Sequence, residues 1–383
     1  MAKGRKEPQD IQRNAQDEIS ELSRTQTGRK KGTHLRSHLS LITVLIATAV
    51  FMPLMVFMTA NSSVFAGNMV RVEGRNPDGE ITDADERSAP LETGGDTVIV
   101  EGIDDPASAS LCIPLSDDTD VNQIRFAEDP LNGRIDIDIP TGTKNFYYKN
   151  ELTGTREGIN GLVYDYKNDT ARFILSTDKY YISSLHLAGD ELYLMLRTPR
   201  EVYGHVCIID PAHGGEDTGS MAYGVSEKDA VLGVANAVTE YAGSMEDGGF
   251  YAVRSTDEEV TDAYREKLVK MLEPDIYLTL EMSADKDTRT TNGVSAAAKD
   301  PGAKGLADKL AGALAAATGQ ENLGAVLDSS IGGYGDAANI VLYLGYITNK
   351  KEALQVSDGA YDVQAGRVIY ETLSGAETWK EEK

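Results

Sequence analysis

One short stretch constrains the fold of this chain more than any other. The apolar run Val206–Ile209 ends in Asp210-Pro211 and continues into a Gly-rich loop that closes at Gly219. Four apolar residues bounded by a turn signal are typical of a buried central strand in an α/β sheet. Because such sheets bind ligands just beyond the carboxyl ends of their strands, we expect a ligand or a metal at His213. A histidine in a turn can also be purely structural.

Strand and helix patterns alternate along the rest of the chain after this run. The predicted strands are 250–253, 275–280, 294–298 and 339–344, and the predicted helices are 228–241, 262–270, 303–318 and 363–373. Such alternation predicts an α/β domain over residues 205–378, with a mixed sheet covered by helices on both faces.

A different pattern, with a period of two, occupies residues 98–200. Ile135, Ile137 and Ile139 alternate with aspartates, and further apolar alternations recur between turn signals such as Asn132-Gly133. Several short strands at regular spacing predict an all-β sandwich domain before the α/β domain.

The first 60 residues predict a membrane segment. Residues 1–39 hold nine Lys and Arg and five Asp and Glu, a net charge of +4, and the apolar run 41–60 follows. About 20 apolar residues can span a bilayer, and a basic amino-terminal flank places that side in the cytoplasm. We therefore expect residues 1–40 to be a flexible cytoplasmic segment and 41–60 a transmembrane signal-anchor. A signal peptide cleaved after Ala66 and a buried core helix are the alternatives.

The overall charge limits the partners and the surroundings of the chain. A net charge of -24 argues against a nucleic-acid partner, because phosphate binding needs a basic surface. Residues 67–97 are rich in Gly, Pro, Asp and Glu and predict an acidic linker that holds the following domains outside the membrane.

An external compartment permits a disulfide, but Cys207 lies in the apolar run, so we expect it to be buried rather than paired with Cys112.

Several short segments after residue 205 occur in a characteristic order. They are Asp210-Pro211-Ala212-His213-Gly214-Gly215, Asp217 with Gly219, Glu227-Lys228-Asp229, Arg254-Ser255-Thr256-Asp257, Arg265, Gly293-Val294 and Gly345-Tyr346-Ile347-Thr348-Asn349. Over about residues 205–375 the chain thereby resembles the zinc-dependent N-acetylmuramoyl-L-alanine amidases of bacterial cell walls, the Amidase_3 type. The resemblance implies an amidase-like fold, zinc as the cofactor and peptidoglycan as the partner. By strand pattern and position, the β domain is similar to the AMIN domains that often precede such amidases and help hold them on the wall.

The resemblance also implies a zinc site of two histidines and a glutamate, with a second glutamate as general base. Such a zinc ion activates water for attack on the amide, and the carboxylate accepts the proton. His213 matches the first ligand and Glu227 the second. Glu281 stands at the position of the second histidine, and Tyr343 at that of the catalytic glutamate. None of the five histidines follows His213, so no later residue can supply a second imidazole.

These two replacements predict a degenerate amidase. One imidazole and two carboxylates can hold a metal, but they favour ions that prefer oxygen ligands. A tyrosine with an ordinary pKa of about 10 is a poor base, and loss of the general base lowers the rate about 10²–10⁴-fold. We expect an extracytoplasmic wall protein that binds peptidoglycan or a wall partner and holds less than stoichiometric zinc. The alternatives are a metal-dependent amidase that works through His213, Glu227 and Glu281, and a structural protein that contacts its partner through the β domain.

Overall fold

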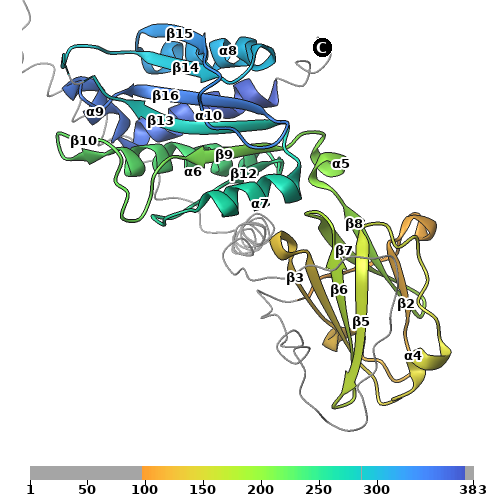
Figure 1. Ribbon diagram of the computed structural model, residues 1–383. Helices are drawn as coiled ribbons and strands as arrows, with labels where there is room; N and C mark the ends of the chain where they lie inside the picture. The colour runs from red at the N-terminus through yellow and green to blue at the C-terminus, as the bar shows by residue number, and fades with distance from the viewer. Residues whose placement is uncertain (1–96, 286, 376–383) are drawn as a thin grey trace, which may run out of the picture. The chain divides into compact units, whose positions relative to one another are not determined.

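The computed structural model describes residues 97–285 and 287–375 (Figure 1). The predictions for residues 1–40, for the apolar run 41–60 and for nearly all of the linker 67–97 lie outside the described residues. Within the two described ranges, no helix has the length and apolar character needed to cross a membrane.

Two four-stranded sheets make up the β domain. Across the first sheet the order is β1 (Ile99–Glu101), β7 (Ile182–Ala188), β8 (Glu191–Arg197) and β2 (Leu111–Pro114); across the second it is β3 (Arg125–Asp129), β4 (Arg134–Pro140), β6 (Thr170–Thr177) and β5 (Ile159–Lys167). Ile113 and Leu194 of the first sheet share a buried hydrophobic cluster with Ile137 and Phe173 of the second. The two sheets therefore form a sandwich, as the period-two alternation predicts.

Short helices join these strands and lead out of the sandwich. They are the 3-10 turns at Pro106–Ser108, Val121–Gln123 and Pro130–Asn132, and the helices α4 (Phe146–Lys149) and α5 (Pro199–Tyr203).

A six-stranded sheet forms the centre of the α/β domain. Its order is β12 (Phe250–Ala252), β9 (Cys207–Pro211), β13 (Ile276–Ser283), β16 (Ala338–Tyr346), β14 (Val294–Ala298) and β15 (Asn322–Leu327). The first four strands are parallel, whereas β14 runs antiparallel to β16 and pairs in parallel with β15. The predicted mixed sheet is confirmed, and residues 207–209 of the apolar run lie in β9, between β12 and β13.

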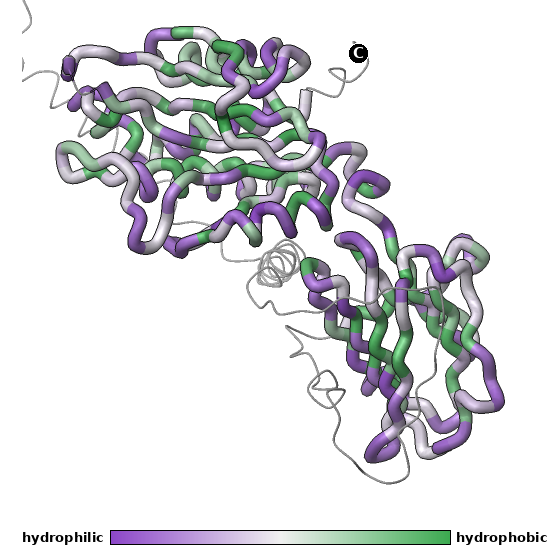
Figure 2. The backbone as a smooth tube through the Cα atoms, viewed as in Figure 1, coloured by the Kyte–Doolittle hydropathy of each residue, from purple (hydrophilic) through white to green (hydrophobic). Residues whose placement is uncertain are grey.

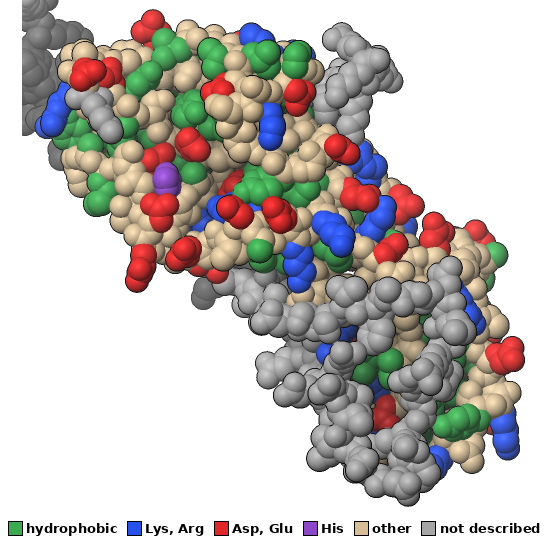
Figure 3. Space-filling model, in the orientation of Figure 1, with side chains coloured by type: hydrophobic (Ala, Val, Ile, Leu, Met, Phe, Trp, Pro, Cys, Tyr) green, Lys and Arg blue, Asp and Glu red, His purple; other side chains and the backbone are tan. Residues whose placement is uncertain are grey.

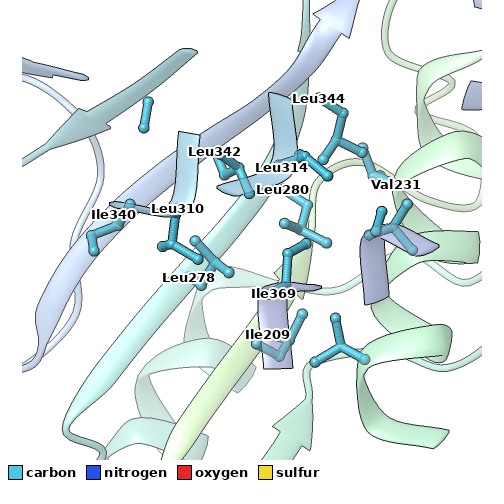
Figure 4. Packing of buried hydrophobic residues seen from close by; sticks show 14 of the residues in the cluster. Ile209, Val231, Leu278, Leu280, Leu310, Leu314, Ile340, Leu342, Leu344 and Ile369 are labelled. Atoms are coloured by element: carbon cyan, nitrogen blue, oxygen red, sulfur yellow. The ribbon is translucent and has the colours of Figure 1, made fainter. Parts of the chain in front are cut away.

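Helices cover both faces of this sheet. The helices α6 (Glu227–Ser244), α8 (Pro301–Thr318), α9 (Lys350–Val356) and α10 (Gly359–Ser374) contribute to the cluster on one face, and α7 (Asp262–Leu272) packs on the other. Figure 4 shows leucine and isoleucine side chains of the strands meeting those of α8 and α10. Figure 2 shows that hydrophobic residues are concentrated in the central strands. Each fully buried leucine or isoleucine contributes about 1.5–3 kcal/mol.

Both cysteines are buried and neither forms a disulfide. Cys207 is fully buried in the cluster beneath α6, as its place in the apolar run predicts.

Candidate active site

The loop after β9 carries the first candidate residue. His213 has a φ of 63°, and it is followed by Gly214, Gly215 and Gly219 with φ values of 137°, 59° and 61°. A left-handed backbone is uncommon at a residue that is not glycine, so the loop holds His213 in a strained conformation. Backbone bonds between Gly214 and Asp217 close the loop on itself. The His213 side chain is 28% exposed at the carboxyl end of β9, where the sequence predicts a ligand.

A fully buried arginine fixes the two ends of this loop. The guanidinium of Arg254 donates to the carbonyl oxygens of Pro211, Ala212, Lys228 and Thr256 at 3.0–3.1 Å. Burial lowers the pKa of Arg254, because desolvation disfavours its charged form. The sequence places Arg254 in a family motif but does not predict that it ties the end of β9 to the start of α6.

Asp210 is structural. Its buried carboxylate accepts hydrogen bonds from Nε of Arg265 at 2.8 Å and from the hydroxyl of Tyr277 at 2.6 Å. Both donors come from elements that pack against β9, namely α7 and β13. These contacts join α7 and β13 to the end of β9, directly before the His213 loop.

His213 lies between two carboxylates. Its Nδ1 is 2.8 Å from Oδ2 of Asp217, and its Nε2 is 3.4 Å from Oε2 of Glu227. Asp217 also accepts from the backbone N–H of Gly219 at 3.0 Å, and the bond with His213 is the main cause of its lowered pKa. When Nδ1–H donates to Asp217, the lone pair of Nε2 faces Glu227, an arrangement that a cation between the two atoms would stabilise.

Glu227 is the first residue of α6 and is almost completely buried. Its Oε1 accepts from the N–H of Met282 at 2.7 Å, and its Oε2 accepts from the N–H of Ser220 at 2.9 Å. Met282 lies at the irregularity in the pairing of β13 with β16, and Ser220 follows the His213 loop. One carboxylate therefore connects the loop, α6 and the end of β13.

The absence of a side chain at Gly219 makes this packing possible. A Cβ atom there would lie 2.5 Å from Cδ2 of His213 and 2.9 Å from Cβ of Glu227. Both distances are far below van der Waals contact, so only glycine fits between the two candidate ligands.

Glu281 and Tyr343 stand side by side on β13 and β16. They are registered partners on adjacent parallel strands, which lie about 4.8 Å apart. Neither side chain makes a hydrogen bond or an ion pair with another described residue. Burial raises the pKa of both groups; Glu227 raises that of Glu281 further, and Glu281 raises that of Tyr343 further. Tyr343 thus keeps its proton near neutrality and can donate a hydrogen bond.

A cavity of about 200 Å³ opens between the His213 loop and the centre of the sheet. His213 and Glu281 line it on one side, and Thr279, Tyr334 and Asn339 line it further along the strands. Acidic side chains are frequent on the face of the α/β domain seen in Figure 3, where a histidine is also exposed.

Two of the three predicted metal ligands are arranged as a metal would need them. Donors about 2.0–2.2 Å from a tetrahedral zinc ion lie about 3.3 Å apart, close to the 3.4 Å between His213 and Glu227. However, no group of three or more His, Cys, Asp and Glu side chains in residues 97–285 and 287–375 could hold a metal. Glu281 faces the same cavity but does not complete a set of three, and its role as a ligand stays a prediction.

The fold and the site together define an α/β domain with a candidate hydrolytic centre at the carboxyl ends of its strands. Residues 207–374 match the family model described as N-acetylmuramoyl-L-alanine amidase. The predicted resemblance is confirmed for the α/β domain. The resemblance of the β domain to AMIN domains stays a prediction.

Individual relatives are distant. The N-acetylmuramoyl-L-alanine amidase LytC of Bacillus subtilis (strain 168) is 24% identical over 177 residues, which are 44% of this chain and 35% of LytC. The match thus spans about a third of the length of that curated relative. Among solved structures, an amidase from Clostridium difficile 630 is 18% identical, with 45% of this chain and 96% of that chain covered and a TM-score of 0.41. The amidase AmiC2 of Nostoc punctiforme is 22% identical, with 44% and 94% covered and a TM-score of 0.40.

Proposed function

We propose that this chain is a membrane-anchored, extracytoplasmic cell-wall protein whose amidase-family domain binds peptidoglycan or a wall partner with little or no hydrolysis. The anchor is the apolar run 41–60, and the β domain is an AMIN-like module that helps hold the protein on the wall. A full-length protein in the membrane fraction supports the anchor, whereas a soluble protein that starts after Ala66 contradicts it.

The observation that carries this proposal is the pair Glu281 and Tyr343. By the resemblance of the sequence, they stand where the family has a zinc-binding histidine and the general base, and in the structure they are registered partners on adjacent strands. A phenol whose pKa lies above 10 cannot accept a proton at neutral pH, so Tyr343 does not replace a carboxylate as base. It can donate a hydrogen bond to a carbonyl oxygen, while Glu281 can accept from an N–H group. Both actions bind a ligand without breaking a bond.

A second candidate function is supported by the other half of the site. The 3.4 Å distance between His213 and Glu227 suits a shared metal ion, and Asp217 holds the imidazole in the orientation that coordination needs. An active amidase would use these residues with Glu281 to cleave the amide between muramic acid and L-alanine. A bound divalent metal would polarise the amide carbonyl.

Metal content and turnover distinguish the two functions. The full-length chain, purified in detergent, is analysed for bound metal and incubated with purified sacculi, with and without EDTA. Less than one equivalent of zinc and no released peptides with new L-alanine amino ends support the proposal. Release of such peptides that disappears with EDTA and with His213→Ala contradicts it and establishes the active amidase. Retention on sacculi by co-sedimentation tests the binding part separately.

A further inference from the structure

Glu281 is a carboxylate whose charged form is favoured by a longer-range attraction to His213 but by no direct contact. It is half-buried, lines the cavity next to His213, and makes no hydrogen bond or ion pair with another described residue. Removing a carboxylate from water without a partner is unfavourable, so a ligand that supplies a positive charge gains affinity here.

The cationic side chains around the site are already engaged. Arg265 pairs with Asp210 and donates to the carbonyl oxygen of Val260. Lys228 donates to the carbonyl oxygen of Gly215 at 2.8 Å and to Asp257 at 2.6 Å. Their donors point into these bonds, so neither cation is available to neutralise Glu281.

The other carboxylates of the site, unlike Glu281, accept hydrogen bonds from described residues. Asp210 accepts from Arg265 and Tyr277, and both oxygens of Glu227 accept backbone N–H groups. Glu281 is the carboxylate at the cavity that a ligand can reach and that has no such donors among the described residues.

We propose, resting on the proposed function, that Glu281 binds the α-ammonium group of a free wall peptide that begins with L-alanine. In intact peptidoglycan this nitrogen belongs to an uncharged amide and cannot form an ion pair. Once the amide is hydrolysed, the nitrogen becomes an amine that is protonated at neutral pH, since α-amino groups have a pKa of about 7.7–8.0. The site therefore prefers the peptide product of amide cleavage over the linked substrate, and an active amidase elsewhere must supply that product.

The geometry of the cavity is consistent with this ligand. Its volume of about 200 Å³ suits the amino end of a peptide. Tyr343 lies beside Glu281 on the next strand and can donate its hydroxyl to the first carbonyl oxygen of the peptide. Polar side chains of Thr279 and Asn339 line the cavity further along the strands.

Calorimetry with three ligands tests the inference on the full-length protein in EDTA. The ligands are the dipeptide L-alanyl-D-isoglutamine, its N-acetyl form, and N-acetylmuramoyl-L-alanyl-D-isoglutamine, and none of them has another amine. Because a hydrogen bond to a charged group contributes about 1.5–3 kcal/mol, the free dipeptide should bind about 10- to 100-fold more tightly than the other two. Its affinity should fall above pH 8, as the amine loses its proton.

Two variants make the result specific to Glu281. Glu281→Gln should abolish the preference for the free amine, whereas Glu240→Gln, on an exposed position of α6, should leave it unchanged. Thermal unfolding verifies that both variants are folded.

Each outcome has one meaning. Equal or tighter binding of the acetylated or muramyl ligand overturns the inference and leaves the proposed function in place. Binding to sacculi without any binding of the dipeptides also overturns the inference and leaves the proposed function in place. Failure to bind either the dipeptides or sacculi overturns both proposals. In a separate titration without EDTA, stoichiometric zinc binding that Glu281→Gln abolishes, in a protein that binds no dipeptide, shows that Glu281 is a metal ligand instead and also overturns the inference.

Discussion

The double variant Glu281→His with Tyr343→Glu should convert the domain into a zinc-binding amidase. The half of the site formed by His213 and Glu227 is already held in place, because Asp217, Ser220 and Met282 fix both side chains by hydrogen bonds. A histidine at position 281 would face the same cavity as His213. A glutamate at position 343 would supply the missing base.

The expected change in rate follows from the chemistry of position 343, and the expected change in stability follows from its pairing with position 281. Burial raises the pKa of Tyr343 above its ordinary value, so the phenol keeps its proton at pH 7, and a carboxylate base should raise the rate about 10²–10⁴-fold. Tyr343→Glu alone would place two carboxylates side by side, about 5 Å apart. Their repulsion, discounted for partial exposure, should destabilise this single variant by about 1–3 kcal/mol. Glu281→His removes that repulsion, so the two changes should be non-additive.

The measurements are zinc affinity by calorimetry, peptide release from sacculi, and urea unfolding of the wild type, both single variants and the double variant. Stoichiometric zinc and turnover that His213→Ala abolishes in the double variant are the expected results. A double variant that unfolds like the wild type but gains neither zinc binding nor hydrolysis would show that the sheet no longer presents positions 281 and 343 to the loop.

Two further predictions concern stability. Gly219→Ala should lower the free energy of unfolding by at least about 2 kcal/mol, because it combines a left-handed backbone with contacts at 2.5–2.9 Å; Gly224→Ala, with φ 82° and open space around it, should lose only the backbone contribution of about 1–2 kcal/mol. Equal losses in urea unfolding would refute the packing argument. Burial between α10 and α6, and secondarily Asp358, raise the pKa of Asp362 to about 6. Since this folded-state pKa lies above the ordinary value of 3.8, the folded protein holds the proton more tightly, and stability should fall as the pH rises from about 4 to 6. Allowing for partial exposure, Asp362→Asn should recover about 1–2 kcal/mol above pH 6 and flatten this slope. An unchanged slope would contradict the assignment.

Most of the α/β domain could be predicted from the sequence because its strands and helices bury one strongly apolar face. The predicted helix 228–241 corresponds to α6, and the predicted strand 339–344 to β16. The sequence does not predict β15 or α9. Strand β15 lies at the edge of the sheet with most of its residues exposed, so its pattern is weak, and α9 spans only seven residues. The side chain of Asn349 caps α9 by accepting from two backbone N–H groups, a local signal that periodicity does not detect.

The candidate site could be predicted residue by residue but not as an arrangement. The position of His213 follows from the end of an apolar strand, and Glu227 and Glu281 follow from resemblance. The contacts of Asp217 and Arg254 could not be predicted, because they depend on how the loop folds back and on which backbone groups lie near a buried side chain. A carboxylate four residues after His213 was the available signal for Asp217.

The two halves of the candidate site differ in how strongly their side chains are bonded to the rest of the fold. The carboxylate of Glu227 satisfies two backbone N–H groups, and an unsatisfied buried donor costs about 1–3 kcal/mol, so replacing Glu227 would destabilise the domain even if catalysis were lost. Glu281 and Tyr343 make no hydrogen bond to a described residue, so replacing either one leaves no backbone group without its partner. Glu227 would therefore be kept for structural reasons even in a protein that does not cleave amides, and its presence alone does not establish an enzyme. The residues that can distinguish the proposed binding function from an active amidase are therefore Glu281 and Tyr343, whose side chains no described hydrogen bond holds.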